Sequence, residues 1–166
     1  LKKIFILTFL HFSLFLQAQN AQDIIDGLKK ELKANPDQKR TATIYSDLTW
    51  YYSDISIDSA IVYGNRAINE SIKTADSILI AQAYGDLSSV YLKNGDYKKS
   101  LDYMKNVLSI RKAKKDISGI ARVYAGIGLL YYTQNKYDLS MKNYLLALEY
   151  VNKTNDDKVK NNIKNA

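Results

Sequence analysis

The chain has 166 residues, 46% of them hydrophobic and 11% aromatic, which suits one domain or one short repeat array with a buried core and argues against disorder. Cysteine is absent and His11 is the only histidine, so disulfides are excluded and the usual zinc ligands and neutral-pH general bases are almost missing. The formal net charge is +7, and the lysines are dispersed along the chain.

The first predicted element is a secretory signal peptide over residues 1–21. Two lysines come first, an apolar run follows over residues 4–16, and small and polar residues come after it. This order is typical of a signal peptide, and we expect cleavage between Ala18 and Gln22. The run is shorter than the ~20 residues that a transmembrane helix needs, although an uncleaved anchor or a buried helix stays as an alternative. We therefore expect an exported protein that is periplasmic or otherwise extracytoplasmic.

A capping helix is expected next, over about residues 23–33, within an N-terminal segment that spans 22–37. No other long apolar run follows Gln22. Attachment to a membrane is therefore expected only through a possible further segment beyond Ala166.

From residue 38 onward the sequence repeats itself with a period of about 40 residues. The stretch 84–100 matches the stretch 124–140 at a shift of 40, and residues 45–52 match the first of these at a shift of 39. The second half of the first repeat returns to a shift of 40, so the turn inside this repeat is one residue shorter. Such a period indicates stacked pairs of helices, because one pair cannot cover its own apolar face.

The period divides the chain into repeats over 38–76, 77–116 and 117–156, and into the start of a truncated fourth repeat over 157–166. The last segment is too short for a stable isolated helix, so we expect it to be weakly ordered and the protein to continue into a further repeat. The helices are expected over about 38–54 and 58–74, 77–94 and 97–114, and 117–134 and 137–154.

Several residue types recur at fixed places for physical reasons. Asp76, Asp116 and Asp156 stand where a helix N-cap is needed. Gly95 and Asn135 fall at turns where a left-handed backbone is expected. Small residues recur where two helices should approach closely, namely Ala60, Ala67, Ser88, Ser100, Gly128, Ser140 and Ala147.

About ten of the 14 tyrosines lie at positions that recur from repeat to repeat, and periodic aromatic residues are usually core residues. The longest basic cluster, residues 111–115, is interpreted as the solvated end of a helix rather than as a nucleic-acid patch. We expect burial of Tyr45, Tyr52, Tyr63, Tyr84, Tyr91, Tyr97, Tyr124, Tyr131, Tyr137 and Tyr144.

The residue types at these recurring positions resemble those of the tetratricopeptide repeat (TPR). Residues 84–100 carry its order of aromatic, Leu, small residue, Tyr, Gly and Tyr, and the resemblance covers about residues 38–155. It implies an all-α fold, a right-handed superhelical array of antiparallel helix pairs, or α-solenoid. The chain departs from the common form in its longer period, in its lack of a proline at the repeat ends, and in placing Asn135 in the Gly column. It also resembles the exported TPR region of many bacterial sensor kinases and regulators.

The resemblance implies a concave groove that is lined by the first helix of each pair and binds a protein or peptide. Its large side chains lie off the packing positions of the repeat and are expected to anchor a partner, unless a neighbouring helix buries them, namely Trp50, Leu92, Leu129 and Tyr132. The predicted groove comprises Trp50, Ser53, Gln82, Ser89, Leu92, Lys93, Arg122, Leu129 and Tyr132, and matching positions also hold Thr43, Ser46, Ala125 and Thr133.

Some members of the family hold the acidic tail of a chaperone with basic and amide side chains in this groove. At the corresponding positions here only Arg122 is basic, and Asp47 and Asp86 would repel a carboxylate, so we expect no such binding. The other positions of that clamp hold Ser46, Trp50 and Gly126.

We expect no catalytic site, no metal and no cofactor. The sequence has no phosphate loop, nucleophile elbow or HExxH motif, and no pair of carboxylates is spaced to face a common cleft. Gly126 and Gly128 follow no predicted strand and are interpreted as helix-packing residues.

Three functions are compatible with this reading. The first is an extracytoplasmic protein-interaction module of a signalling protein, and the second is a free-standing periplasmic scaffold or assembly factor. The third, a nucleic-acid binder recruited by positive charge, conflicts with export, so we expect no nucleic-acid partner. A transmembrane segment and signalling domain beyond Ala166 would favour the first function, and a stop codon would favour the second.

Overall fold

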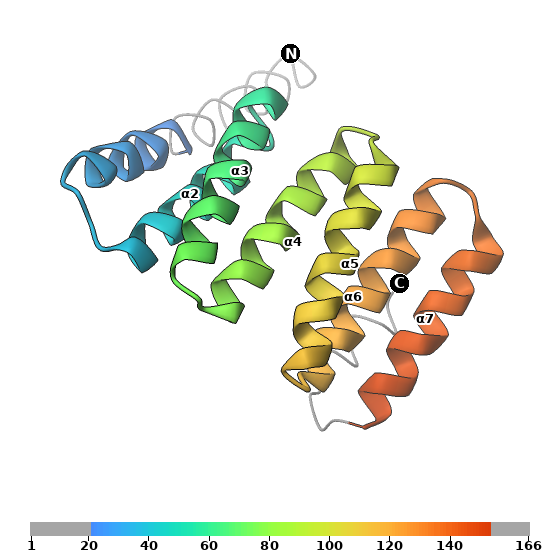
Figure 1. Cartoon of the computed structure of the whole chain (residues 1–166). Helices are drawn as coiled ribbons and strands as arrows, with labels where there is room; N and C mark the ends of the chain where they lie inside the picture. Colours follow the sequence, from blue (N-terminus) through green and yellow to red (C-terminus); the bar gives the residue numbers. More distant parts are fainter. Residues whose placement is uncertain (1–20, 154–166) are drawn as a thin grey trace, which may run out of the picture.

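The computed structural model describes residues 21–153 (Figure 1). No strand occurs within this range, and each predicted helix end lies within two residues of the observed one. The predicted signal peptide, apart from Ala21, and the predicted fourth repeat lie outside the described residues. A first helix over 21–33 precedes α2 (Gln38–Tyr52), α3 (Ile57–Lys73), α4 (Ser77–Lys93), α5 (Tyr97–Ala113), α6 (Ile117–Thr133) and α7 (Tyr137–Asn152).

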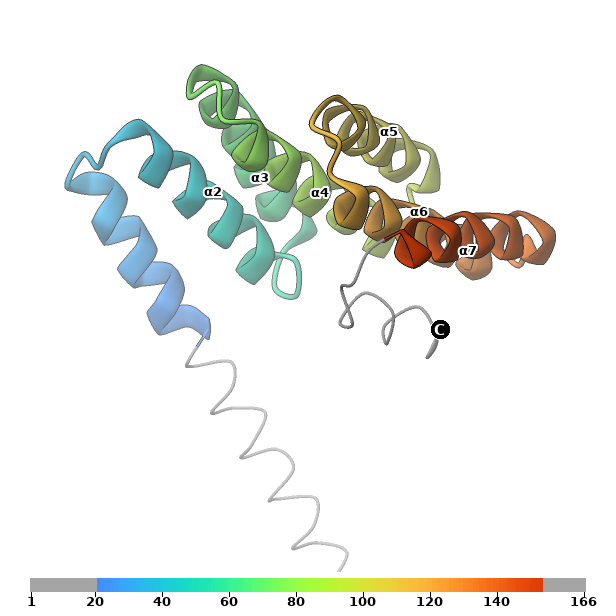
Figure 2. The same cartoon turned by 90° about the horizontal axis from the view of Figure 1, so that it is seen from below.

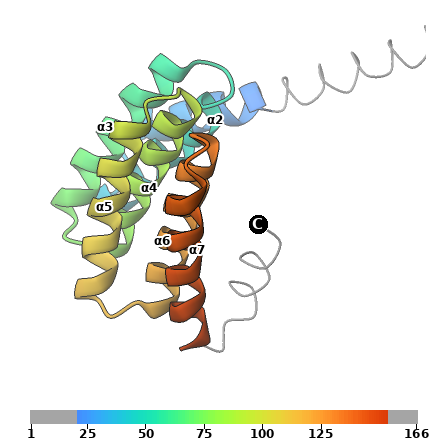
Figure 3. The same cartoon turned by 90° about the vertical axis from the view of Figure 1, so that its right-hand side faces the viewer.

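The six helices form three antiparallel pairs that stack in a row, α2 with α3, α4 with α5 and α6 with α7. Seen from below, the row bends into an arc with the first helix at one end and α7 at the other (Figure 2). The view from one end places α3 and α5 along one side of the array and α2 on the other side (Figure 3). The fold is therefore the α-solenoid of helix pairs that the repeat predicted.

Small residues allow the paired helices to approach closely, as predicted. The Ser88 hydroxyl lies 3.0 Å from the Ser100 carbonyl oxygen and donates a hydrogen bond to it, and both residues are buried. A Cβ atom added to Gly128 would lie 3.0 Å from the ring of Tyr144, which is tighter than most real contacts. The other small residues named from the repeat are also buried, namely Ala60, Ala67, Ser140 and Ala147.

Short polar side chains begin five of the six helices from α2 to α7. The predicted N-caps Asp76 and Asp116 are confirmed, since their carboxylates accept from the backbone N–H groups of α4 and α6. Lys136 precedes α7 without a side-chain cap, and the predicted cap Asp156 lies outside the described residues. The sequence analysis missed the caps of α2, α3 and α5, which are Asp37, Ser56 and Asp96.

The two predicted left-handed turn residues are confirmed, with φ of 78° at Gly95 and 57° at Asn135. After Gly95, the Asp96 N–H donates to the Tyr91 carbonyl at 2.9 Å, which closes a Schellman motif at the end of α4. Ala75 and Lys115 also have positive φ, of 54° and 55°, in the connections between repeats. Sequence reasoning missed these two because such residue types seldom adopt that conformation.

The turn between α2 and α3 is the one that the sequence predicted to be a residue shorter. α2 ends at Tyr52, two residues before its predicted end. The Tyr52 carbonyl accepts hydrogen bonds from the N–H groups of Ile55 and Ser56, at 3.0 and 2.8 Å. The connection 53–56 therefore has four residues, one more than the connection 94–96 of the next repeat, so the prediction of a shorter turn is wrong and α2 is instead two residues shorter than α4. None of residues 53–56 has positive φ, unlike Gly95 in the next repeat.

The prediction of a tyrosine core is wrong in part. Of the ten tyrosines named, Tyr91 alone is buried, at 7% exposure, while Tyr137 is 59% exposed at the start of α7. Most of the others are partly buried, and several stack on a neighbour, as Tyr52 does on Tyr63 with ring centroids 5.2 Å apart. The long tyrosine side chains thus line the edges of the repeats. The largest fully buried side chains are aliphatic, namely Ile25, Ile44, Leu48, Leu87, Val90, Leu130 and Val151.

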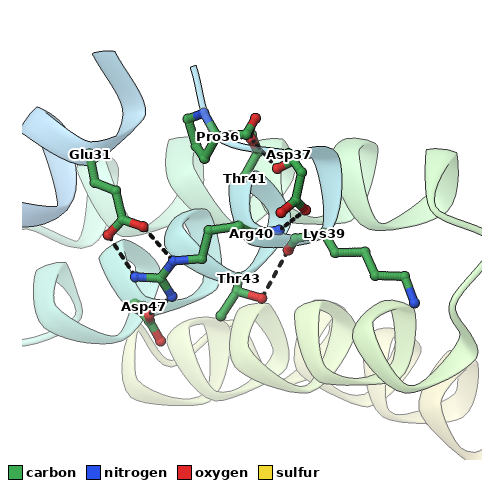
Figure 4. A network of polar contacts seen from close by, with 8 residues as sticks. All are labelled: Glu31, Pro36, Asp37, Lys39, Arg40, Thr41, Thr43 and Asp47. Carbon is green, nitrogen blue, oxygen red and sulfur yellow. Dashed lines mark hydrogen bonds and ion pairs between the residues drawn. The ribbon is translucent and has the colours of Figure 1, made fainter. Parts of the chain in front are cut away.

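The first helix caps the array by packing against α2. Its Ile25 and Leu28 form one apolar cluster with Ile44 and Leu48 of α2. A polar clamp closes the same junction (Figure 4), where the Arg40 guanidinium donates to both carboxylate oxygens of Glu31, at 2.6 and 2.7 Å. Hydrogen bonding to Arg40 lowers the pKa of Glu31. This helix therefore has the capping position that the sequence predicted.

Candidate partner-binding groove

A groove of about 480 Å³ lies between α4 and α6, with α5 as its floor. Each helix contributes residues three or four positions apart, which is one helical face. This volume is within the usual range of binding sites. The lining includes Gln82, Gly85, Asp86 and Ser89 from α4, Met104 and Val107 from α5, and Arg122, Val123 and Gly126 from α6.

Two glycines explain why the groove lies here. Between the first two repeats α2 and α4 pack side by side, and Ser46 of α2 hydrogen-bonds Asp86 of α4. The matching positions on α4 and α6 are Gly85 and Gly126, which have no side chains to meet. α4 and α6 accordingly make no packing contact comparable to that of α2 with α4. The prediction that Gly126 packs two helices together is therefore incomplete, since it also lines an open space.

The Asp86 carboxylate of this groove lies in surroundings that oppose its ionisation. Burial raises the pKa of Asp86 to about 6, the Ser46 hydroxyl lowers it, and the nearby Asp47 carboxylate raises it. Asp86 forms no ion pair with any residue in the described range. Burial also raises the pKa of Asp47, and Arg40, whose Nη1 lies 4.0 Å away, lowers it. The charged form of Asp86 is therefore disfavoured by its surroundings in the groove.

The cations of the groove are engaged within the protein. Arg111 pairs with Asp116 at 2.8 Å, and its stem lies against Gly119, where an added Cβ would be 2.7 Å from the Arg111 Cδ. The Arg122 guanidinium donates to the Ser118 hydroxyl at 2.9 Å. Arg122 lies one helical turn before Gly126, so it is offset along the groove from the open glycine position.

The structure brings three of the predicted site residues, Gln82, Ser89 and Arg122, into this groove. Trp50, Ser89 and Leu129 occupy equivalent positions on α2, α4 and α6, the first helices of the three pairs. We call the side of these helices that carries the three residues the inner face. Trp50 is 64% exposed and Leu129 is 46% exposed. The alternative that neighbouring helices bury them is therefore wrong within the described residues.

The remaining predicted residues lie at the C-terminal ends of the same helices. Ser53, Leu92 and Tyr132 occupy one equivalent repeat position, and Tyr132 is 57% exposed and packs edge-on against Tyr137. Lys93 forms an ion pair with Asp54 of the preceding repeat, so it fixes one helix end to the next turn. Ser46, predicted to face the groove, is buried because it contacts α4.

Sequence reasoning missed the residues that shape the groove itself. The repeat pattern does not single out Gly85, and for Asp86 it predicts only repulsion of a carboxylate. The floor residues Met104 and Val107 belong to a second helix, which the family pattern does not assign to a binding surface. A signal was present, since Gly is unfavourable inside a helix and Gly85 lies in the middle of one.

Within residues 21–153, no group of three or more His, Cys, Asp or Glu side chains could hold a metal ion. In the same part of the chain, no helix combines the length and apolar character needed to cross a membrane.

Solved structures with a similar arrangement are TPR proteins or contain similar helical arrays. The TPR domain of Arabidopsis FLU is 18% identical, with a TM-score of 0.63 over 71% of this chain and all of that one. The apo form of RapI is 18% identical, with a TM-score of 0.70 over 81% of this chain and 39% of that one. The N-terminal domain of stress-induced protein-1 (STI-1) from C. elegans is 16% identical, with a TM-score of 0.56 over 78% of this chain and 97% of that one.

These identities show a shared fold and nothing more specific. A search among curated proteins gave no match. The family profile of the SusR N-terminal TPR domain matches residues 17–160, which is most of the chain and includes every helix described above. The chain therefore belongs to the family of SusR N-terminal TPR domains.

Proposed function

We propose that this protein is a non-catalytic interaction module that binds a polypeptide on its inner face. The observation that carries the proposal is the exposure of three large side chains on α2 and α6, Trp50, Leu129 and Tyr132, of which Tyr132 also packs edge-on against Tyr137. Aromatic side chains of this kind are the usual anchors of protein interfaces. TPR domains in general bind protein or peptide partners, which agrees with this reading.

We also propose that the module is exported and forms the extracytoplasmic part of a signalling protein. The basic, apolar and then polar order of the first 22 residues supports export. The family match is to a domain described as N-terminal, which suits a protein with further domains after the repeats. N-terminal sequencing of protein recovered from an exporting host tests the first point, and an intact Lys2–Lys3 in the mature product would contradict it.

The test of polypeptide binding uses alanine variants and a peptide selected from a random phage library on the full-length chain. Trp50→Ala and Tyr132→Ala should each weaken binding by about 2 kcal/mol, as loss of an interface anchor does. Isothermal titration calorimetry gives the affinities.

Ile72→Ala and Val62→Ala serve as matched controls, because both side chains are about half exposed on α3, outside the inner face. They should leave the affinity unchanged. If the α3 variants weaken binding as much as the inner-face variants do, the proposed binding surface is wrong.

A further inference from the structure

Gly85 keeps the groove open without any packing reason. A Cβ atom placed on Gly85 would meet nothing within 4 Å, whereas one on Gly128 would press on a tyrosine ring. Gly is the least favourable helix residue after Pro, so a glycine that no close contact requires weakens α4. Gly126 on the facing wall has only the end of Met104 nearby, at 3.4 Å. The pair of glycines therefore leaves space that ordinary side chains could have filled.

The walls beside this space differ in charge. Asp86 is adjacent to Gly85 and has only the Ser46 hydroxyl as a partner among the described residues, with the Asp47 carboxylate of α2 nearby. The cations that line the groove are Arg111 on α5, which is paired with Asp116, and Arg122 on α6, one turn away from Gly126. The open glycine position thus lies next to an anion that has no cation of its own.

The floor of the groove is apolar. Met104 and Val107 of α5 and Val123 of α6 line it below the charged wall. A Lys or Arg side chain buries its aliphatic stem on such a surface and keeps its charged end with a carboxylate. From these three features we infer that the groove holds a Lys or Arg side chain of the bound polypeptide, with its charge against Asp86 and its stem on the floor. This inference rests on the proposed function and specifies the chemistry of the partner.

The experiment begins with the same phage selection of random 12-residue peptides on the full-length chain at pH 7.5. Enriched peptides should carry a Lys or Arg next to an apolar residue. Synthetic copies with blocked ends and no tryptophan are then titrated while the fluorescence of Trp50, the only tryptophan, is followed. Replacing the basic residue of the peptide by Gln should weaken binding tenfold or more, since a partly buried charge pair is lost.

Two protein variants test the groove, each with a matched control. Asp86→Asn should weaken binding on the order of tenfold or more, whereas Asp102→Asn, an exposed carboxylate on α5, should not. Gly85→Leu should fill the groove and weaken binding similarly. Gly27→Leu is its control, because a Cβ there also meets nothing within 4 Å and Gly27 lies on the first helix, outside the groove.

The pH dependence supplies a readout that a purely structural role of Asp86 would not give. With the pKa of Asp86 at about 6, the carboxylate is largely ionised at pH 7.5 and largely protonated at pH 5. The affinity of the wild-type chain for the basic peptide should therefore fall about tenfold between these pH values. Asp86→Asn should remove most of that dependence.

The outcomes separate this inference from the proposed function. If Trp50→Ala weakens binding while Asp86→Asn and Gly85→Leu do not, or if the enriched peptides lack basic residues, the inference is wrong and the inner face still binds polypeptides. If no peptide is enriched, or no inner-face variant changes the affinity, both are contradicted. Circular dichroism and melting of each variant show that it is folded before its affinity is compared.

Discussion

At the scale of single residues, exposure separates side chains that hold the fold from those that are available to a partner. Tyr91 is 7% exposed and stacks on Tyr103 with ring centroids 5.5 Å apart, so Tyr91→Ala should lower the free energy of unfolding by about 3 kcal/mol. Trp50→Ala removes an exposed ring and should change it by less than about 0.5 kcal/mol. Urea denaturation followed by circular dichroism measures both. An equal loss in the two variants would make Trp50 a structural residue.

Asp86 should reduce stability at neutral pH. Its pKa is about 6 in the folded protein and about 3.9 in the unfolded chain, so the folded state binds this proton more tightly. The contribution of Asp86 to the free energy of unfolding therefore falls as pH rises from about 4 to about 6. Asp86→Asn should accordingly stabilise the protein by about 1–3 kcal/mol at pH 7 and by little at pH 4. An equal effect of the substitution at both pH values would show that ionisation of Asp86 does not destabilise the folded protein.

At the scale of the helices, two glycines inside helices should respond oppositely to the same change, because only one of them is closely packed. Gly128→Ala places a methyl group 3.0 Å from the Tyr144 ring, so this ring must shift, with a loss of about 1–3 kcal/mol. Gly85→Ala meets no atom and should raise stability by up to about 1 kcal/mol through better helix propensity. Thermal and urea denaturation of both variants test this. A destabilised Gly85→Ala would mean that α4 and α6 are closer together than described.

The turns give a second contrast at this scale. Lys115 holds a left-handed backbone with φ of 55°, which is unfavourable for a residue with a Cβ atom, so Lys115→Gly should stabilise by about 1 kcal/mol. Gly95→Ala at φ of 78° should destabilise by a similar amount. The midpoints of urea denaturation measure both changes, and the same sign for both would contradict the turn geometry.

Helix positions and turn residues could be predicted because each depends on local rules that the sequence repeats. Asp76 and Asp116 cap helices, and Gly95 ends one, wherever the 40-residue period places them. The burial of tyrosines could not be predicted in the same way. Periodicity shows which side of a helix a ring is on, but not how far its neighbours cover it. Tyr137 packs edge-on against Tyr132 of α6 and is still 59% exposed.

At the scale of the whole molecule, the stacking of three helix pairs follows from the period, but the groove does not. The groove depends on what faces Gly85 across the space between two repeats, and Gly126 is 41 positions further along the chain. The sequence showed a helix-packing glycine at Gly126, and only the arrangement of α4, α5 and α6 shows an opening there. The exposure of Trp50 and Tyr132 was predictable, because both lie off the packing positions of the repeat.

Polypeptide binding on the inner face can be mapped by the backbone amide chemical-shift changes that occur when a selected basic peptide is added to the isotope-labelled full-length chain. Changes should concentrate on α2, α4 and α6 and on the groove-lining part of α5, around Trp50, Asp86 and Tyr132. Changes concentrated instead on α3 and the outer side of α7 would show that the polypeptide does not bind the inner face.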